Sequence, residues 1–184
     1  MSAVSILMLP GYGDSGPEHW QSFWEAADPR ARRVVQRDWL EPRLDDWLTV
    51  LDREISACPT PPVLVAHSLG CVLAAHWVAR TRRTVAGAML VAPADVDAIA
   101  LILDAVASFA PVPLIRLPFP SVVVVSDDDS YAPRERAEAF AHAWGSRLVV
   151  FPGIGHINSE SGLGAWPEGR ALLDELLTRV AGGP

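Results

Sequence analysis

Residues 63–79 read VLVAHSLGCVLAAHWVA, a short apolar run joined to a longer apolar segment. The first run, 63–66, is rich in valine and has the length of a buried β-strand. The segment 69–79 is apolar nearly all round, which is typical of a helix packed into the centre of a domain. Only His67 and Ser68 separate the two parts. The stretch therefore predicts a strand, a sharp turn and a helix.

Short apolar runs and segments of helical period alternate along the rest of the chain. The runs predict strands at 4–9, 33–36, 63–66, 87–91, 122–125 and 148–151. The helical period predicts helices at 18–27, 44–55, 69–79, 133–144 and 167–180. The least regular region, 95–120, is interpreted as a helix followed by a proline-rich excursion. This alternation predicts a compact α/β fold with a mostly parallel central sheet, helices on both faces and little or no lid.

Length and composition favour a single globular domain over residues 1–184. Half of the 184 residues are apolar, which is enough for a full core. The 22 acidic and 15 basic residues leave a net charge of −7, which disfavours nucleic acid as a partner. All the basic residues are arginine, so a lysine nucleophile is excluded.

The sequence also bears on compartment and on metal binding. No apolar run approaches the roughly 20 residues that a membrane-spanning helix needs. The two cysteines, Cys58 and Cys71, lack the spacing of metal ligands, and the chain shows no signal peptide. We therefore expect a cytoplasmic protein with reduced cysteines, no membrane span and no metal site.

The motif Ala66-His67-Ser68-Leu69-Gly70 stands at the predicted turn. A serine on a sharp strand-to-helix turn presents its hydroxyl outward, and it needs small residues two positions before and after it. Ala66 and Gly70 meet this need, which favours Ser68 as a nucleophile. The alternative is a tight turn with a buried structural serine.

A serine hydroxyl needs a neighbouring base to become a good nucleophile, and histidine is the usual one. His156 follows the last predicted strand and precedes the last predicted helix, in the loop Pro152-Gly153-Ile154-Gly155-His156. The chain order of serine, carboxylate and histidine predicts that it is the base. The other histidines are interpreted as packing, solvated or structural residues, with His67 pointing away from the serine: His19, His67, His76 and His142.

The third group must be a carboxylate after the preceding strand, where Asp127, Asp128 and Asp129 stand. Its role is to accept the Nδ1 proton of His156, which fixes the tautomer and stabilises the imidazolium that forms during attack. Asp129 is preferred because the run Asp129-Ser130-Tyr131-Ala132-Pro133 resembles the Asp-x-x-aliphatic-Pro run that often follows this strand in α/β-hydrolases. Asp128 is the alternative, and the remaining aspartates are interpreted as turn formers or helix caps.

When a serine attacks a carbonyl carbon, the oxyanion that develops needs two backbone N–H donors. The first is the amide after the nucleophile, Leu69. The second should follow the first strand, where Leu9-Pro10-Gly11-Tyr12-Gly13 forms a glycine-rich loop. Tyr12 is the amide that we predict there. The alternative is a turn that only ends the strand.

With these residues, the chain resembles the small serine hydrolase family that includes retinoblastoma-binding protein nine and its bacterial relatives. The resemblance runs nearly end to end, and its most specific pieces are GDSGPEHWQ (13–21), AHSLG (66–70), VAPADV (91–96), GHIN (155–158), SG (161–162) and WPEG (166–169). It implies a compact α/β-hydrolase fold, a triad of Ser68, Asp129 and His156, no cofactor, and esterase activity on short acyl substrates.

Two positions depart from that family's pattern. Ala66 stands where the family often has glycine, and Ser130 stands where proline often follows the catalytic aspartate. Neither change removes a reacting group. The Leu-x-Cys-x-Glu motif linked to retinoblastoma binding is absent, because Leu69-Gly70-Cys71-Val72-Leu73 lacks the glutamate. That partner is therefore not expected.

We therefore expect a serine hydrolase, namely a carboxylesterase that acts on short-chain or small acyl esters through an acyl-enzyme. Its partner would be a small-molecule ester. The alternatives are a catalytically silent binding protein on the same scaffold and a serine peptidase or amidase. The apolar segment 99–119 is either a helix packed on the sheet or a pocket wall formed by Ile102, Phe109, Leu114, Ile115 and Phe119.

Overall fold

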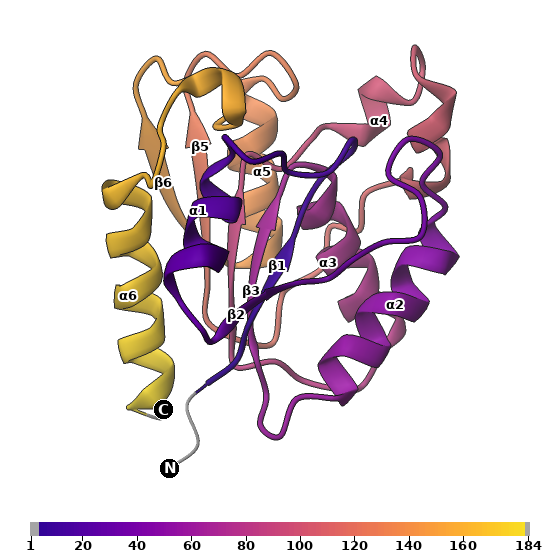
Figure 1. The fold of residues 1–184 in the computed structure, drawn as a ribbon. Helices are drawn as coiled ribbons and strands as arrows, with labels where there is room; N and C mark the ends of the chain where they lie inside the picture. Colours follow the sequence, from indigo (N-terminus) through magenta and orange to yellow (C-terminus); the bar gives the residue numbers. More distant parts are fainter. Residues whose placement is uncertain (1–3, 183–184) are drawn as a thin grey trace.

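A six-stranded sheet forms the centre of the computed structural model, which describes residues 4–182 (Figure 1). In spatial order its strands are β2 (Ala31–Arg33), β1 (Ile6–Leu9), β3 (Val63–His67), β4 (Gly87–Val91), β5 (Ser121–Ser126) and β6 (Arg147–Phe151). All neighbouring strands are parallel. The inner strands are short apolar runs that are buried on both faces, as is usual in parallel sheets. The predicted α/β fold is confirmed.

Helices cover both faces of the sheet (Figure 1). On one face lie α1 (Trp20–Ala27) and α6 (Pro167–Ala181), and on the other lie α2 (Leu44–Ser56), α3 (Leu69–Arg80) and α5 (Arg134–Trp144). Each layer of helices packs on its own hydrophobic core. Among the helices of residues 4–182, none combines the length and the apolar character needed to cross a membrane.

Successive residues of β3 point into different cores. Leu64 and Ala66 belong to the core beneath α2, α3 and α5, whereas Val63 and Val65 belong to the core beneath α1 and α6. Side chains alternate along a strand with a period of two. The last residue of the strand, His67, is therefore directed to the α1 and α6 side.

The second strand lies earlier in the chain than the sequence predicted. It spans Ala31–Arg33, where it pairs with residues 6–8 of β1, rather than 33–36. Val35 already lies outside the strand and is exposed. The apolar pair Val34-Val35 misled the prediction, because a strand at the edge of a sheet does not need a continuous apolar run.

The region between β4 and β5 follows the predicted pattern of a helix and then an irregular stretch. It contains the single helical turn α4 (Val96–Ile99) and the 3-10 helix η1 (Asp104–Phe109). The remainder, up to β5, is irregular and rich in proline. A second 3-10 helix, η2 (Ser159–Ser161), precedes α6.

Gly70 allows α3 to begin against the end of β1. A Cβ atom built at Gly70 would lie 2.3 Å from the carbonyl oxygen of Leu9 and 2.8 Å from that of Pro10. Both contacts are with backbone atoms, which cannot rotate aside as the end of a side chain can. The small residue required two positions after the serine is thus explained by the close approach of two backbones.

We expect Gly70→Ala to lower the free energy of unfolding by about 2 kcal/mol, because the backbone must shift to admit the methyl group. Equilibrium denaturation in urea measures this change. Gly16→Ala is the matched control, since nothing lies within 4 Å of a Cβ atom built at Gly16. Equal stability of the two variants would contradict the close packing at Gly70.

Candidate active site

Ser68 stands at the turn between β3 and α3 in a strained backbone conformation. Its φ is 53° and its ψ is −118°, a combination that residues other than glycine rarely adopt. Gly11, in the loop after β1, lies against it, because a Cβ atom built at Gly11 would be 2.8 Å from the Ser68 Cβ. The serine therefore sits at the carboxyl edge of the sheet, where functional loops of α/β folds gather.

Three side chains from distant parts of the chain meet at this edge. The Ser68 Oγ lies 2.9 Å from the His156 Nε2, and the His156 Nδ1 lies 3.0 Å and 2.9 Å from the two carboxylate oxygens of Asp129. A carboxylate can only accept, so Nδ1 carries the proton and Nε2 is left to accept from the serine hydroxyl. The structure brings together the three residues that the sequence analysis selected, with Asp129 rather than Asp128 beside the histidine.

The histidine and the aspartate are shielded from solvent. Their side chains are 9% and 3% exposed. The Tyr131 ring packs on the His156 ring with centroids 4.3 Å apart, and the Tyr131 amide donates to Asp129 Oδ1 over 2.8 Å. A single tyrosine thus contacts both residues. This role of Tyr131 was not predicted, because its only signal in the sequence is its position two residues after the aspartate.

The loop that carries His156 is braced by the loop that carries Asp129. Three consecutive amides of the loop that carries His156 donate to side chains at the end of β5 and in the loop after it: Gly153 to Asp127 (2.8 Å), Ile154 to Ser126 (2.9 Å) and Gly155 to Asp128 (2.7 Å). The left-handed φ angles of Gly153 and Gly155, 62° and 60°, explain the glycines there. Asp127 and Asp128 lie in a turn, as one of the two interpretations expected, and their side chains join the two loops rather than cap a helix.

The sequence predicted that the His67 side chain points away from Ser68, and this prediction is wrong. His67 lines the same cavity as Ser68, and its Nε2 lies 2.9 Å from the backbone oxygen of His156. A carbonyl oxygen can only accept, so Nε2 carries the proton. Burial, with smaller effects from His156 and His19, holds the pKa of His67 well below its ordinary value. The ring is therefore a neutral donor.

His19 lies next to His67, with ring centroids 4.7 Å apart. Its Nδ1 accepts from the Gln21 amide over 3.2 Å and caps α1, which is a structural role of the kind the sequence analysis assigned. Burial first, and then the charges of Arg33 and His156, lower the pKa of His19 to about 4. At neutral pH its single proton is therefore on Nε2, which has no hydrogen-bond partner among residues 4–182.

The two amides predicted to bind an oxyanion belong to the segments that border Ser68. Leu69 is the first residue of α3, so its N–H has no acceptor within the helix. Tyr12 lines the cavity over Ser68, in a turn whose next two amides donate to other backbone carbonyls. Leu69 lies two residues after the end of β3, and Tyr12 lies three residues after the end of β1.

A cavity of about 220 Å³ opens over Ser68. Besides Ser68 and three histidines, it is lined by Tyr12, Asp14, Tyr131, Asn158, Ser159 and Glu160. Of the two alternatives for segment 99–119, the one in which it forms a wall of the pocket at Ser68 is wrong. None of its residues lines this cavity, Ile102 is 90% exposed, and Phe109 is buried in the core beneath α2 and α3.

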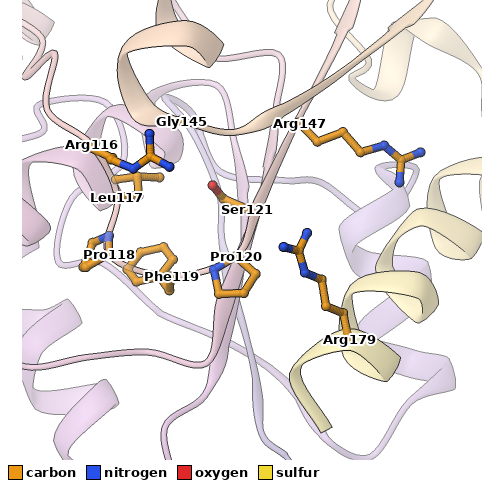
Figure 2. A pocket seen from close by; sticks show the side chains of 9 residues that line it. All are labelled: Arg116, Leu117, Pro118, Phe119, Pro120, Ser121, Gly145, Arg147 and Arg179. Atoms are coloured by element: carbon orange, nitrogen blue, oxygen red, sulfur yellow. The ribbon is translucent and has the colours of Figure 1, made fainter. Parts of the chain in front are cut away.

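A larger cavity, of about 510 Å³, lies at the amino ends of β5 and β6, on the opposite edge of the sheet (Figure 2). Three arginines border it: Arg116, Arg147 and Arg179. The guanidinium of Arg116 lies over Gly145, and Arg147 pairs with Glu175 over 2.8 Å. Ser68, His156 and Asp129 do not line this cavity.

The cysteine closest in sequence to Ser68 packs in the core. Cys71 is fully buried, with its Sγ 3.3 Å from the Val91 carbonyl oxygen, and burial raises the pKa of its thiol well above the usual range. Across residues 4–182, no group of three or more histidine, cysteine, aspartate or glutamate side chains is arranged to hold a metal ion.

Comparison with known proteins identifies a family and several similar structures. The model of a family described as serine hydrolase matches residues 6–175. A protein described as a YdeN-like hydrolase, from Pectobacterium atrosepticum, is 35% identical, with a TM-score of 0.86 over 97% of this chain and 92% of that chain.

Two other solved structures are more distant in sequence and share the fold. The ydeN gene product of B. subtilis is 22% identical, with a TM-score of 0.78 over 96% of this chain and 100% of that chain. A thermophilic esterase from Thermogutta terrifontis is 17% identical, with a TM-score of 0.67 over 97% of this chain and 91% of that chain. A search of curated proteins gave no significant match.

Proposed function

The chain belongs to the serine hydrolase family of α/β-hydrolases, and from this premise we propose that it is an esterase with a catalytic triad of Ser68, His156 and Asp129. The observation that carries the proposal is the pair of contacts at His156. One ring nitrogen lies 2.9 Å from the serine hydroxyl, and the other lies 2.9 Å from a carboxylate oxygen. These are the contacts that a serine nucleophile, its base and the orienting acid require.

In the proposed reaction, the Ser68 Oγ attacks the ester carbonyl carbon while the His156 Nε2 takes the hydroxyl proton. Asp129 orients the imidazole and stabilises the imidazolium. The amides of Leu69 and Tyr12 donate to the developing oxyanion. His156 then gives the proton to the departing alcohol. Water attacks the acyl-enzyme by the same route, which releases the acid and restores the serine hydroxyl.

The shape and polarity of the cavity favour a small substrate. Its volume of about 220 Å³ is below the roughly 300–1,000 Å³ of pockets that hold drug-sized ligands. Its walls include the carboxylates of Asp14 and Glu160 and the polar side chains of Asn158 and Ser159. A long acyl chain would not fit inside such a cavity. We therefore propose short acyl esters as the substrate class.

For p-nitrophenyl esters, we expect kcat/KM to fall by at least about tenfold between the butyrate and the decanoate. The reason is that a chain too long for a cavity of about 220 Å³ must bend out of it or displace its walls, and this cost reduces the binding of the transition state. Initial rates across the acetyl to decanoyl series measure this, at ester concentrations below those that form micelles. A kcat/KM that rises steadily with chain length would contradict the proposed substrate class.

The bond that is cleaved is tested with two substrates that share an acetyl group. p-Nitrophenyl acetate is an ester and p-nitroacetanilide is the matching amide. We expect hydrolysis of the ester and a kcat/KM for the anilide that is lower by several orders of magnitude. Comparable values of kcat/KM for the two compounds would favour an amidase. If the protein hydrolysed neither compound and no other ester, a binding protein would be favoured.

A further inference from the structure

We infer that His67 is a positioning residue, which holds the backbone of His156 so that its ring stays beside Ser68. This inference rests on the proposed catalytic roles of Ser68 and His156. It is carried by one hydrogen bond, in which the His67 Nε2–H donates to the carbonyl oxygen of His156 over 2.9 Å. The bond joins residues that are 89 positions apart in the chain.

His67 and Ser68 are adjacent residues that contact opposite parts of His156. His67 bonds its backbone oxygen, while the Ser68 Oγ faces its Nε2. His67 ends β3, which pairs with β1 and β4 and is buried along its whole length. One end of the contact is thus built into the sheet. Because the peptide bond joins His67 to Ser68, the two contacts with His156 together fix the distance between the serine hydroxyl and the imidazole.

The next residue of the same loop is anchored in the same way. The Trp20 Nε1–H donates to the carbonyl oxygen of Ile157 over 2.8 Å. Ile157 has a φ of 50°, a strained value for a β-branched residue, and such strain persists only where the surroundings hold it. Two consecutive carbonyls therefore accept from the ring N–H groups of buried side chains. These two bonds add to the loop's own backbone hydrogen bond, which the Ile157 amide donates to the Ile154 carbonyl oxygen over 3.4 Å.

The charge state of His67 suits this role. Its neighbours on either side are His19 and His156, with ring centroids at 4.7 Å and 4.9 Å. Burial keeps His67 neutral, so it donates from Nε2 throughout the range in which an ordinary histidine titrates. A neutral ring also places no positive charge beside the imidazolium that forms on His156 during the reaction.

If His67 only filled space in the core, any ring of similar size would serve in its place.

His76 offers a comparison within the same chain. It is also a buried histidine, and its Nε2 lies 2.7 Å from the carbonyl oxygen of Phe109. It belongs to α3 and does not line the cavity over Ser68. Loss of its hydrogen bond should affect stability without affecting the chemical step.

Two substitutions separate the hydrogen bond from the packing. His67→Phe keeps a ring and removes the donor, while His67→Gln removes the ring and keeps an N–H donor near the place of Nε2. We expect His67→Phe to lower kcat for p-nitrophenyl acetate by about 10–100-fold with little change in KM, because a base displaced by a fraction of an ångström transfers the proton less well. His67→Gln should retain kcat to within about fivefold.

The matched control is His76→Phe, which should keep the kcat of the wild type. Near-normal kcat in His67→Phe would overturn the inference. So would equal losses in His67→Phe and His67→Gln, because the donor would then not be the cause.

The tautomer of His67 provides a test that needs neither activity nor a folded variant. In long-range ¹H–¹⁵N spectra of the wild-type protein, we expect His67 to carry its proton on Nε2 and not to titrate between about pH 5 and 8. A proton on Nδ1, or titration in that range, would overturn the inference. A wild type that hydrolyses no ester would refute the proposed function, while the spectra would still decide whether His67 makes this bond.

Discussion

Ser68→Ala is expected to lower kcat for p-nitrophenyl acetate by at least about 10⁴-fold. The hydroxyl is the group that faces His156 Nε2 at 2.9 Å, and a methyl group in its place cannot attack a carbonyl carbon. The strained turn, the cavity and the amides near the serine all remain in the variant. Any residual rate should therefore come from binding and from stabilisation of the oxyanion. Initial rates at saturating substrate measure the change.

Ser159→Ala is the matched control for that experiment. Ser159 lines the same cavity and lies outside the proposed triad, so kcat should stay within about threefold of the wild type. Circular dichroism and thermal midpoints should show that both variants are folded. If Ser68→Ala kept more than about a tenth of the wild-type kcat, the serine could not be the nucleophile.

Asp129→Asn is expected to lower kcat by about 10³–10⁴-fold. The carboxylate now accepts from the Nδ1–H of His156 through both of its oxygens. An asparagine can instead donate to Nδ1 through its amide N–H, which moves the imidazole proton to Nε2 and leaves no acceptor for the serine hydroxyl. It also removes the negative charge that stabilises the imidazolium. The expected loss is in kcat, with a smaller change in KM.

Asp128→Asn tests the assignment of the acid against its closest rival. The Asp128 Oδ1 accepts from the Gly155 amide over 2.7 Å, and the oxygen of an asparagine can accept the same bond. We expect a loss of no more than about tenfold. Equal losses in Asp128→Asn and Asp129→Asn would contradict the placement of Asp129 as the partner of His156.

The fold could be predicted from the sequence because most of its strands are short, continuous apolar runs. Val63–His67 and Ser121–Ser126 are buried along their whole length, and such runs are typical of the inner strands of a parallel sheet. The edge strand Ala31–Arg33 carries two arginines and lacks this signal. Its bounds depended on pairing with β1, which no local pattern records.

The site was only partly predictable. Ser68 and His156 could be selected because a small-residue turn and a glycine-rich loop mark their places in the chain. The choice between Asp128 and Asp129 was open, because adjacent residues with the same chemistry differ only in direction. His67 was misjudged for another reason. The alternation of side chains along β3 predicts the face of the sheet to which His67 points. The residue that it contacts there, His156, comes 89 residues later in the chain.

The role of segment 99–119 was left open for a similar reason. Hydrophobicity alone does not say whether an apolar side chain meets the core, a cavity or solvent. Phe109 is buried in the core, whereas Leu101 and Ile102 are largely exposed. The side chains that line the cavity come instead from the end of β3 and the turn after it, and from the loops after β1, β5 and β6. Most of these are polar, and their sequences carry no pattern that marks a pocket.

Reaction with a fluorophosphonate tests most directly whether Ser68 is an activated nucleophile. Such a reagent forms a stable adduct with a serine whose hydroxyl is activated by a base. After brief treatment, intact-mass spectrometry should show one adduct on the wild-type protein and none on Ser68→Ala. A folded wild type that gains no adduct, or an equal adduct on both proteins, would contradict the proposed role of Ser68.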